Sequence, residues 1–283
     1  MLRANFYHDC YLKTGWIPMQ PLSRKIAVGD VCQIQHGNVL PLLNLEQANV
    51  VESISISNAL HLNPIEWAIQ RGVMQTHCAI RTDANKAGEP YQWTEQVLEF
   101  DAPGSFLFHG QEPRAHLLLN WHHIKDDVTL KLTQLHYSFR DVYVITGVAS
   151  MPDWGLAIAG QAGAQLEMSA TVGNTDYYAL LSHQSAQTVK CRGINCYEQS
   201  KGMPAHFFKA KKLVISDESY DHYLRKVIAD EEELGLRATA NWLASNLLNL
   251  VKSNELNLNT CIKFFSWVDC SLDDVARLVE TNQ

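Results

Sequence analysis

The sequence of 283 residues lacks an uncharged apolar run long enough for a membrane-spanning helix. One of its longest such stretches, from Trp154 to Leu166, is interrupted by Gln161 and Gln165 and falls short of the roughly 18 residues that a spanning helix needs. Only 19% of residues are charged and 46% are apolar, which excludes wholesale disorder. The net charge of -7 argues against a nucleic-acid-binding protein, which would normally have a basic surface.

The common catalytic motifs are also missing. There is no HExxH, GxSxG or GxxxxGK[ST] pattern, and the glycines do not have the spacing of a dinucleotide-binding loop. Cys191 and Cys196 have no second close Cys or His pair to complete a structural zinc site. We therefore expect no enzyme and no metal. A Cys/His hydrolase using Cys10, or Cys78 beside His77, stays open, because the sequence does not show which thiol and imidazole lie close together.

The cysteine content indicates a reducing compartment. Seven cysteines form an odd, scattered set, and the first residues lack the apolar core of a secretory signal. We therefore expect the inactive protein to be cytoplasmic.

Most of residues 1–216 have the pattern of short strands separated by turn residues. One helix is expected from Asn63 to about Val73, with Asn63 as its N-cap and Pro64 at its first position. The best internal loop is NKAGEP, residues 85–90. The candidate strands cover residues 30–35, 53–57, 105–108, 116–121, 128–135, 141–150, 156–171 and 204–215. The fold class is therefore α+β, with a body that is mostly β.

The last 68 residues differ in kind, because they carry helix starts and leucines at helical spacing. Helices are expected near residues 217–233, 237–252 and 258–268. Another should begin at Ser271, with Asp274 three residues later in a capping-box pattern. From residue 217 onward, 12 acids and 6 bases give a charge of -6, whereas 18 acids and 17 bases before it give -1. Nearly all the net negative charge thus lies in this helical tail.

Three segments alternate strictly between apolar and polar residues. The longest spans residues 162–172, VTLKLT at residues 128–133 repeats the pattern, and SISIS at residues 53–57 is a shorter copy. Alternation is typical of any half-buried strand, and also of a membrane-spanning strand with lipid on one side and water on the other. The apolar positions of the two longer segments are Val128, Leu130, Leu132, Ala162, Ala164, Leu166, Met168, Ala170 and Val172.

A basic run lies between residues 189 and 212. Its six bases and the single acid Glu198 give a net charge of 6 - 1 = +5; the bases are Lys190, Arg192, Lys201, Lys209, Lys211 and Lys212. Near an anionic membrane each base can contribute on the order of 1 kcal/mol of binding free energy. The run is equally compatible with a solvated rim or with a docking surface for the acidic tail.

Three stretches make the sequence resemble the gasdermins, specifically the compact bacterial type. The opening CYLKTGWIP at residues 10–18, followed by IAVGDV at residues 26–31, is similar to the start of bacterial gasdermins. DVYVITGV at residues 141–148 resembles a strand that reads YVVTEV in animal gasdermins, with Gly147 in place of Glu. AHFFKAKKLVI at residues 205–215 resembles the last strand of the pore-forming domain.

The resemblance implies a twisted, mainly antiparallel β-sheet with flanking helices, held inactive as a monomer by a C-terminal segment. An activating protease would remove that segment, and the body would then form a homo-oligomer on anionic lipids of the inner membrane and insert two β-hairpin regions. In bacteria this causes cell death as a defence against phage. The resemblance also implies a palmitoyl group on an N-terminal cysteine. Cys10 is the candidate, although an ordinary buried thiol explains this residue equally well.

These expectations divide the chain into a body and a cover. Residues 1–256 would be the pore-forming body, with a β-rich core up to residue 216 and helices over 217–252, and residues 257–283 the autoinhibitory segment. The segment would shield the alternating strands, and the polar stretch KSNELNLNT at residues 252–260 would be cut. The shielding residues would be Phe264, Phe265, Trp267, Leu272 and Val275. A β-rich binding module with a helical appendage is the third class that remains open.

Overall fold

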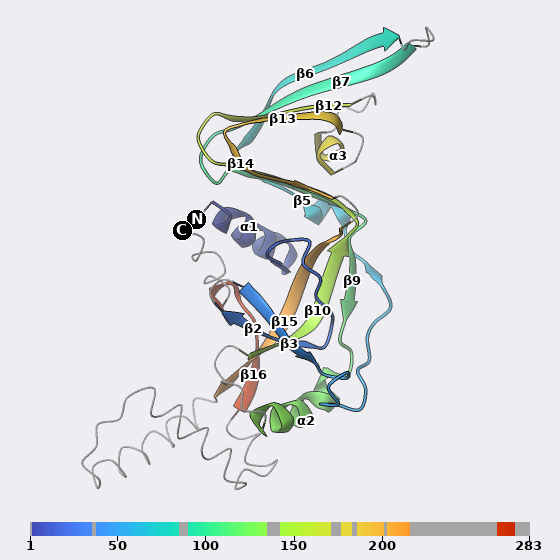
Figure 1. The fold of residues 1–283 in the computed structure, drawn as a ribbon, viewed down its shortest axis with the longest axis vertical. Coiled ribbons are helices and arrows are strands. Elements are labelled where there is room, and N and C mark those ends of the chain that lie inside the picture. Colours follow the sequence, from blue (N-terminus) through green and yellow to red (C-terminus); the bar gives the residue numbers. More distant parts are fainter. Residues whose placement is uncertain are drawn as a thin grey trace, which may run out of the picture.

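The computed structural model describes residues 2–35, 38–84, 90–134, 142–170, 177–182, 186–200, 203–215 and 265–274. Their strands form three sheets stacked along the long axis of the molecule, here called distal, middle and basal from top to bottom of Figure 1. Every strand pairing among these residues is antiparallel. The expected α+β class with a mainly antiparallel sheet is thus confirmed.

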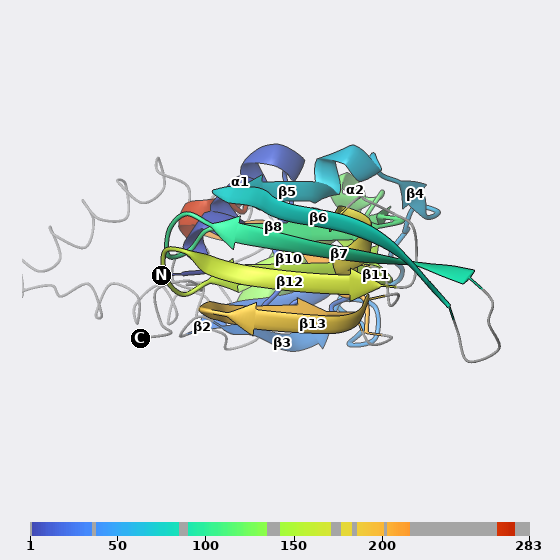
Figure 2. The ribbon, with the colours of Figure 1, turned by 90° about the horizontal axis from the view of Figure 1, so that it is seen from above.

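The distal sheet is built from two pairs of neighbouring strands. Its order is β13 (Ala186–Arg192), β12 (Ala164–Ala170), β7 (Pro90–Phe100) and β6 (Val73–Ala84). Residues 85–89, within the expected loop, join β6 to β7, and the connection from β12 to β13 includes the short helix α3 (Tyr177–Ser182). The β6–β7 hairpin extends beyond β12 and β13 (Figure 2).

The two central strands of the middle sheet are buried on both faces. Its order is β14 (Ile194–Gln199), β11 (Asp153–Ala159), β8 (Phe106–Gln111) and β5 (Ala68–Arg71). On β11, Ala157 and Ala159 pack toward the distal sheet, while Leu156 and Ile158 pack toward the helix α1. A strand buried on both faces has a continuous apolar sequence, and this explains the long apolar run from Trp154.

The single strand expected over residues 156–171 is in fact two strands joined by a turn. These strands, β11 and β12, belong to different sheets, and residues 160–163 turn between them. Gly163 has φ +69°, in the left-handed region that favours glycine. Ala162 lies in this turn and is exposed, so its assignment to an alternating strand is wrong.

The basal sheet carries the other strands. Its main path is β1 (Ile17–Pro18), β15 (Ala205–Ile215), β10 (Val142–Met151), β2 (Asp30–Gln35) and β3 (Asn38–Asn44). In addition, β16 (Phe265–Asp269) pairs with β15, β9 (Arg114–Leu117) with β10, and β4 (Leu60–His61) with β9. The expected strands at 30–35, 141–150 and 204–215 are confirmed to within one residue at each end. Residues 53–57 form an isolated bridge, Ile56 to Leu118, rather than a strand.

Two short helical elements flank the sheets. Helix α1 (Ala4–Thr14) lies between the middle and basal sheets and ends at Gly15, whose φ is 70° and whose N–H donates to the Tyr11 carbonyl at 2.7 Å (Figure 1). Asn63 caps a 3₁₀ helix, η1 (Pro64–Trp67), by accepting the Ile65 N–H at 3.2 Å. The expected cap is confirmed, but the helix expected to reach residue 73 gives way to β5.

The segment expected as a strand at residues 128–135 belongs to helix α2 (Trp121–Gln134) at the foot of the basal sheet. Trp121, Ile124, Val128 and Leu132 are buried at helical spacing, while Leu130 is only partly buried. Six residues are too few to separate a period of two from a period of 3.6. The prediction of a strand with Val128, Leu130 and Leu132 on one face is therefore wrong for this structure, and their insertion into a membrane stays a prediction.

The C-terminal segment is described only from Phe265 to Asp274. Residues 265–268, expected at the end of a helix, form part of strand β16. One of the two hydrogen bonds of the expected capping box is confirmed, since the Ser271 backbone N–H donates to Asp274 Oδ2 at 2.9 Å. The Ser271 hydroxyl donates to the same oxygen at 3.0 Å. The helices expected over 217–252, the boundary at 256, the cut region at 252–260, and Val172, Lys201, Phe264 and Val275 lie outside the described residues. Within those residues, no helix is long and apolar enough to cross a membrane.

Candidate membrane-inserting sheet and C-terminal latch

The inner face of the distal sheet, which packs on the middle sheet, carries no charge at its described positions from the base to the middle of the sheet. Directly paired residues of antiparallel strands point to the same face, so the register defines this surface. Its members are Val73, Gln75, Cys78 and Ile80 of β6, Phe100, Leu98, Gln96 and Thr94 of β7, Ala164, Leu166, Met168 and Ala170 of β12, and Cys191 and Val189 of β13. The four β12 residues share one face as predicted, and all four are fully buried.

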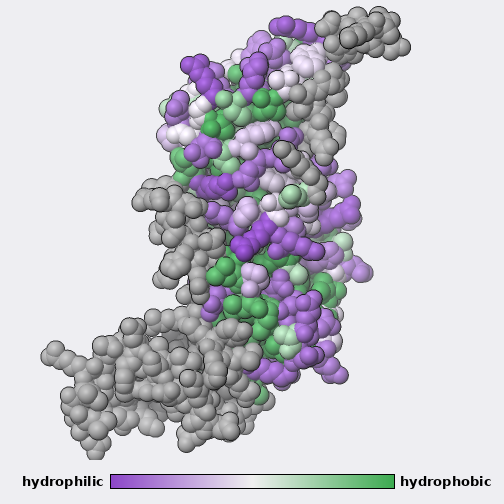
Figure 3. All heavy atoms as spheres, in the orientation of Figure 1, coloured by the Kyte–Doolittle hydropathy of each residue, from purple (hydrophilic) through white to green (hydrophobic). Residues whose placement is uncertain are grey.

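The outer face of the same sheet is charged and polar. Lys190 Nζ lies 2.5 Å from Glu167 Oε1, and this hydrogen bond raises the pKa of Lys190. Arg81 Nη2 lies 3.7 Å from Glu95 Oε2. Hydrophilic side chains are prominent along the top of the molecule, where this face lies (Figure 3). The distal sheet thus has one uncharged side and one charged side.

The cover of the inner face is α3 together with the middle sheet. Leu180 and Leu181 of α3 are buried in the same cluster as Leu166 and Met168. A β-carbon at Gly155 of β11 would overlap the Leu181 carbonyl oxygen, so glycine is needed for this close approach.

Two hydrogen bonds fix α3 to the other strands of the middle sheet. His109 Nδ1–H of β8 donates to the Tyr178 carbonyl at 2.8 Å, and the Tyr177 hydroxyl donates to Gln70 Oε1 of β5 at 3.0 Å. In the part of the C-terminal segment that is described, residues 265–274, the contacts are with the basal sheet and α2 instead. Residues 265–274 therefore do not shield residues 162–172, as was expected of the C-terminal segment.

The described C-terminal residues form a latch on the edge of β15. Strand β16 pairs with β15 from Ile215 opposite Phe265 to Lys211 opposite Asp269. Trp267 Nε1–H donates to Thr129 Oγ1 of α2 at 2.8 Å, and its ring meets Trp121 edge to face with centroids 5.1 Å apart. Three of the five predicted shielding residues, Phe265, Trp267 and Leu272, thus pack on the body. We call residues 265–274 the latch.

Two ion pairs join the latch to lysines of β15. Lys211 Nζ lies 2.7 Å from Asp269 Oδ1, and Lys212 Nζ lies 2.6 Å from Asp274 Oδ1. Partial burial would raise the pKa of Asp274, but its hydrogen bonds to Lys212 and Ser271 outweigh burial and hold the pKa below its ordinary value. The acidic tail therefore docks on part of the basic run, one of the interpretations that the sequence left open.

Acidification should loosen the latch. A carboxyl with a lowered folded-state pKa stabilises the fold above its unfolded pKa of about 3.9, and that contribution is lost as the pH falls through the folded-state pKa. Asp274→Asn should therefore lower the urea midpoint of the full chain at pH 7, and the difference from wild type should shrink below about pH 3.5. Equal midpoints at pH 7 would show that this ion pair contributes nothing to docking.

The basic run is divided between two distant sheets. Lys190 and Arg192 are exposed on the outer face of the distal sheet, whereas Lys209, Lys211 and Lys212 lie on β15 of the basal sheet. Lys209 is exposed, with Nζ 4.8 Å from the centroid of the Trp16 ring. The run is therefore not one continuous lipid-binding patch.

Cys10 is fully buried on α1. Its Sγ lies 3.8 Å from Thr14 Oγ1 and from the Trp16 carbonyl oxygen, and burial raises the pKa of the thiol to about 12. Such a thiol is a poor nucleophile at neutral pH. Acylation of Cys10 stays a prediction. In the folded protein it would require α1 to move so that the thiol becomes accessible.

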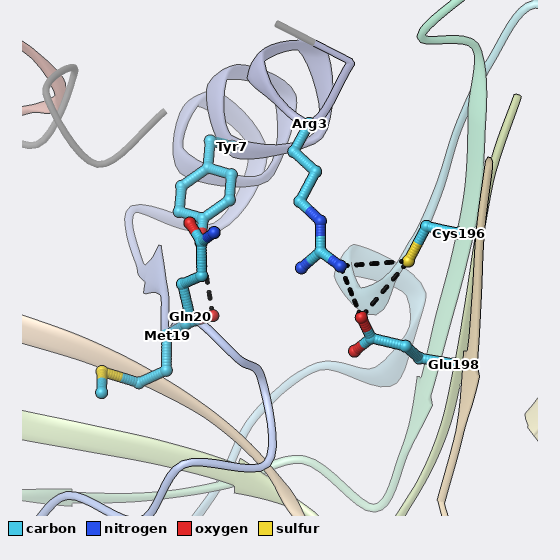
Figure 4. A network of polar contacts seen from close by, with 6 residues as sticks. All are labelled: Arg3, Tyr7, Met19, Gln20, Cys196 and Glu198. Atoms are coloured by element: carbon cyan, nitrogen blue, oxygen red, sulfur yellow. Dashed lines mark hydrogen bonds and ion pairs between the residues drawn. The ribbon is translucent and has the colours of Figure 1, made fainter. Parts of the chain in front are cut away.

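Polar contacts hold α1 on the middle sheet. The Arg3 guanidinium, at the start of α1, donates to Glu198 Oε1 at 2.6 Å and to Cys196 Sγ at 3.2 Å on β14 (Figure 4). Asp9 Oδ1 lies 2.5 Å from Arg71 Nη2 of β5. Cys196 thus has a role in packing α1, and this role has no signature in the sequence.

Strands β6 and β7 and helix α3 were not predicted from the sequence. Strand β6 is an edge strand with most of its side chains exposed and a bulge at Thr76, so its sequence does not alternate cleanly. In β7 the buried face includes Thr94 and Gln96, which hides the apolar pattern. Only the turn residues of the loop at 85–90 pointed to this hairpin.

Two solved structures matched by the chain are gasdermins, the family that the sequence resembles. The cryo-EM structure of the gasdermin A3 membrane pore is 8% identical, covers 75% of this chain and 89% of that chain, and has a TM-score of 0.34. The bacterial gasdermin from Bradyrhizobium tropiciagri is 10% identical, covers 74% and 86%, and has a TM-score of 0.30. No family model and no curated protein matches the chain.

Proposed function

We propose that this chain is an autoinhibited pore-forming protein. A protease removes the C-terminal segment, and the released body assembles on a membrane and inserts the strands of the distal sheet. The observation that supports this most is the two-sided character of that sheet, uncharged inside and charged outside. A membrane-spanning strand requires this contrast, because lipid contacts one face and water the other.

Strand length supports the same assignment. β6 has 12 residues and β7 has 11, enough for the roughly 9–11 residues with which a tilted strand crosses a bilayer. β12 and β13 have 7 residues each and are too short. We infer that the segment joining them, which includes α3, adds to both strands on insertion. Unseating α3 would then lengthen the second hairpin and uncover the inner face in one step.

Insertion and assembly should be coupled. An unpaired strand edge in hydrocarbon leaves backbone groups unsatisfied, at several kcal/mol each. The edges of the distal sheet are β6 and β13, and with four antiparallel strands these edges run in opposite directions. The β6 edge of one copy can therefore pair antiparallel with the β13 edge of the next, so that the pattern continues from copy to copy.

The latch would keep the body silent in two ways. It occupies the edge of β15 from Lys211 to Ile215, and it pairs two lysines that could otherwise face anionic lipid. Cleavage would open this edge and free both lysines. In this proposal the latch controls membrane binding and assembly, while α3 covers the apolar surface.

Neutralising the two β15 lysines that pair with the latch should weaken membrane binding only after cleavage. Lys211→Gln/Lys212→Gln should reduce binding of the cleaved protein to anionic vesicles by about 1 kcal/mol, roughly fivefold, because adjacent strand residues point to opposite faces and only one of these lysines can meet the membrane. The uncut chain should hardly be affected. Vesicle co-sedimentation measures both. Lys131→Gln on the exposed side of α2 is the matched control and should behave as wild type. Equal binding by the double variant would remove these lysines from the lipid-binding surface.

The decisive experiment compares cut and uncut protein. A protease recognition sequence inserted between residues 256 and 257 allows the folded full chain to be cleaved in place. Cleavage should release dye from anionic vesicles, and the uncut chain should not. In a bacterial host, residues 1–256 should be toxic and the full chain tolerated. If the cleaved protein neither binds vesicles nor releases dye from them, the proposal is refuted.

The biological role proposed is death of the infected cell before phage is released. Host cells that carry the full chain should lose membrane integrity on infection and yield fewer phage, provided that an activating protease is present. Cells that carry a variant unable to leak should yield phage at the level of empty cells. Equal protection by the silent variant would separate defence from pore formation.

An acyl chain on Cys10 would add an anchor to this process. A single chain gives only marginal membrane binding and needs a second signal, which the freed lysines would supply. Intact-mass measurement of membrane-bound and soluble protein, with Cys10→Ser as control, tests this. An unmodified Cys10 in membrane-bound protein would exclude acylation from the mechanism.

A further inference from the structure

A pocket lies at the junction between the latch and the body. It has a volume of about 400 Å³ and lies beside α2 at the foot of the molecule (Figure 1). Phe265, Ser266 and Trp267 of the latch form one wall, and residues of α2 together with Lys211 of β15 form the other. Pockets that bind small organic molecules typically have about 300–1,000 Å³. Because the two walls belong to different parts of the chain, the complete pocket exists only while the latch is docked.

The apolar part of the pocket is built from aromatic rings of both walls. Trp121 of α2 and Trp267 of the latch meet edge to face at an angle of 88°, and Phe265 adds a third ring. The hydrogen bond to Thr129 fixes the Trp267 indole, which is only partly buried. Aromatic rings pack favourably in offset-stacked or edge-to-face arrangements, so this surface favours a ligand with a flat ring.

The polar part of the pocket offers a cation beside these rings. Lys125 of α2 is partly buried, and among the described residues its ammonium has no ion-pair partner, although Asp126 also lines the pocket. Lys211 differs, because it already pairs with Asp269. The exposed His122 lies three residues before Lys125, on the same side of the helix, and adds a ring nitrogen at the rim. An acidic ligand group would therefore gain a charge-assisted hydrogen bond here.

We propose that this pocket binds a small organic anion with an aromatic ring, and that the bound anion holds the latch on the body. The ring would pack against Trp121 and Trp267, and the acidic group would contact Lys125. Because the ligand needs both walls, it binds the docked form more tightly and shifts the docking equilibrium toward that form. At ten times its Kd the shift is about elevenfold. The regulatory part of this inference rests on the proposed function, whereas the binding site does not.

Three compounds with the same ring and different charge test the site. They are 1-naphthaleneacetate, its neutral amide and 2-(1-naphthyl)ethylamine, each titrated into the uncut full chain by calorimetry. A ligand of this size is expected to bind with a Kd of up to about 1 mM. The acid should bind about fivefold more tightly than the amide or the amine, as expected for one partly exposed ion pair. Equal binding of the three compounds, or no binding of the acid at ten times that concentration, would overturn the inference.

Substitutions at Lys125 locate the site. Lys125→Gln should weaken binding of the acid about fivefold and leave binding of the amide unchanged, whereas Lys125→Arg should retain both. Lys131→Gln, on the same helix but outside the pocket lining, is the matched control and should bind the acid as the wild type does. Acid affinity that Lys125→Gln leaves unchanged would place the compound elsewhere and overturn the inference. If Lys125→Gln fails to fold, as judged by its urea midpoint, the three compounds still decide.

The effect on the latch is measured without a membrane. The full chain with the inserted protease site is cleaved in place, and gel filtration measures the Kd of residues 257–283 for the body. At ten times its own Kd, the naphthaleneacetate should lower this Kd about tenfold, whereas the amine at the same concentration should lower it about threefold or less. An unchanged Kd with the acid bound would overturn the regulatory part. Absence of dye release after cleavage would refute pore formation and leave the binding site standing.

Discussion

Cys78→Lys should abolish vesicle leakage by the cleaved protein, whereas His77→Lys should leave leakage close to wild type. The two residues are neighbours near the middle of β6, and both are exposed in the inactive protein. Their partners show that they point to opposite faces, since Cys78 lies opposite the buried Gln96 and His77 lies opposite Val97 of the outer face. The same new charge would therefore meet lipid at one position and water at the other.

The expected difference is large because every copy carries the substitution. A lysine on the lipid face at the bilayer midplane costs about 2–4 kcal/mol for each strand that carries it. On the water face it costs almost nothing. Dye release from anionic vesicles, measured at equal amounts of bound protein, reports the effect.

Folding controls keep this test interpretable. Both variants should match wild type in urea midpoint before cleavage, because neither side chain is buried. Cys78→Ser should leak normally, which separates the charge from the loss of the thiol. Full leakage by Cys78→Lys would refute insertion of the inner face.

A charge at Leu166 is a less informative test. Leu166→Lys is expected from the sequence alone to abolish leakage with folding intact. In the structure, Leu166 of the distal sheet is fully buried against the middle sheet and α3. A buried unpaired charge destabilises a protein by several kcal/mol. The variant would therefore lose leakage through misfolding, so the exposed position 78 replaces it.

The local sequence pattern predicted those strands that pack one face regularly against a core. β2 has the predicted bounds, and the alternation of β12 correctly placed Ala164, Leu166, Met168 and Ala170 together, because this strand has its inner face in a core. The same pattern failed at residues 128–133. There the buried residues of α2 also fit a helical period, and Trp121 and Ile124, upstream of the window, decide between the two.

The latch could not be predicted from sequence because its partners are remote. Phe265–Asp269 becomes a strand by pairing with β15, at least 50 residues earlier, and the indole of Trp267 donates a hydrogen bond to Thr129 of α2. The capping contact at Ser271, in contrast, depends on two residues three positions apart, and it was predicted correctly. In this segment the contact between residues close in sequence could be predicted, whereas the pairing with a distant strand could not.

The structure also changes how cleavage would act. The latch lies on the basal sheet, and the inner face of β12 is covered by α3 and the middle sheet. Removal of the latch thus exposes an edge and two lysines, and leaves the apolar surface covered. We infer that uncovering happens later, on the membrane, where each copy can exchange the contacts of α3 for lipid and for neighbouring strands.

Trp267→Ala should make the uncut full chain leak. The indole loses its edge-to-face contact with Trp121, its hydrogen bond to Thr129 and its burial, together about 3 kcal/mol. An equilibrium between docked and undocked latch would then shift roughly hundredfold toward the undocked form. Dye release by uncut protein should rise from background, and amide exchange along the β15 edge should accelerate.

The neighbouring residue provides the control for this prediction. Val268 points away from Trp267 along the strand and its exposed fraction is 43%, so Val268→Ala should change leakage little. Trp267→Phe keeps an aromatic ring but loses the bond to Thr129, and it should fall between the two. Faster exchange without leakage would mean that the latch docks as described but does not hold the body silent. Unchanged exchange and leakage would mean that the tryptophan is not what holds β16 in place, and the strand pairing with its ion pairs would then have to carry the docking alone.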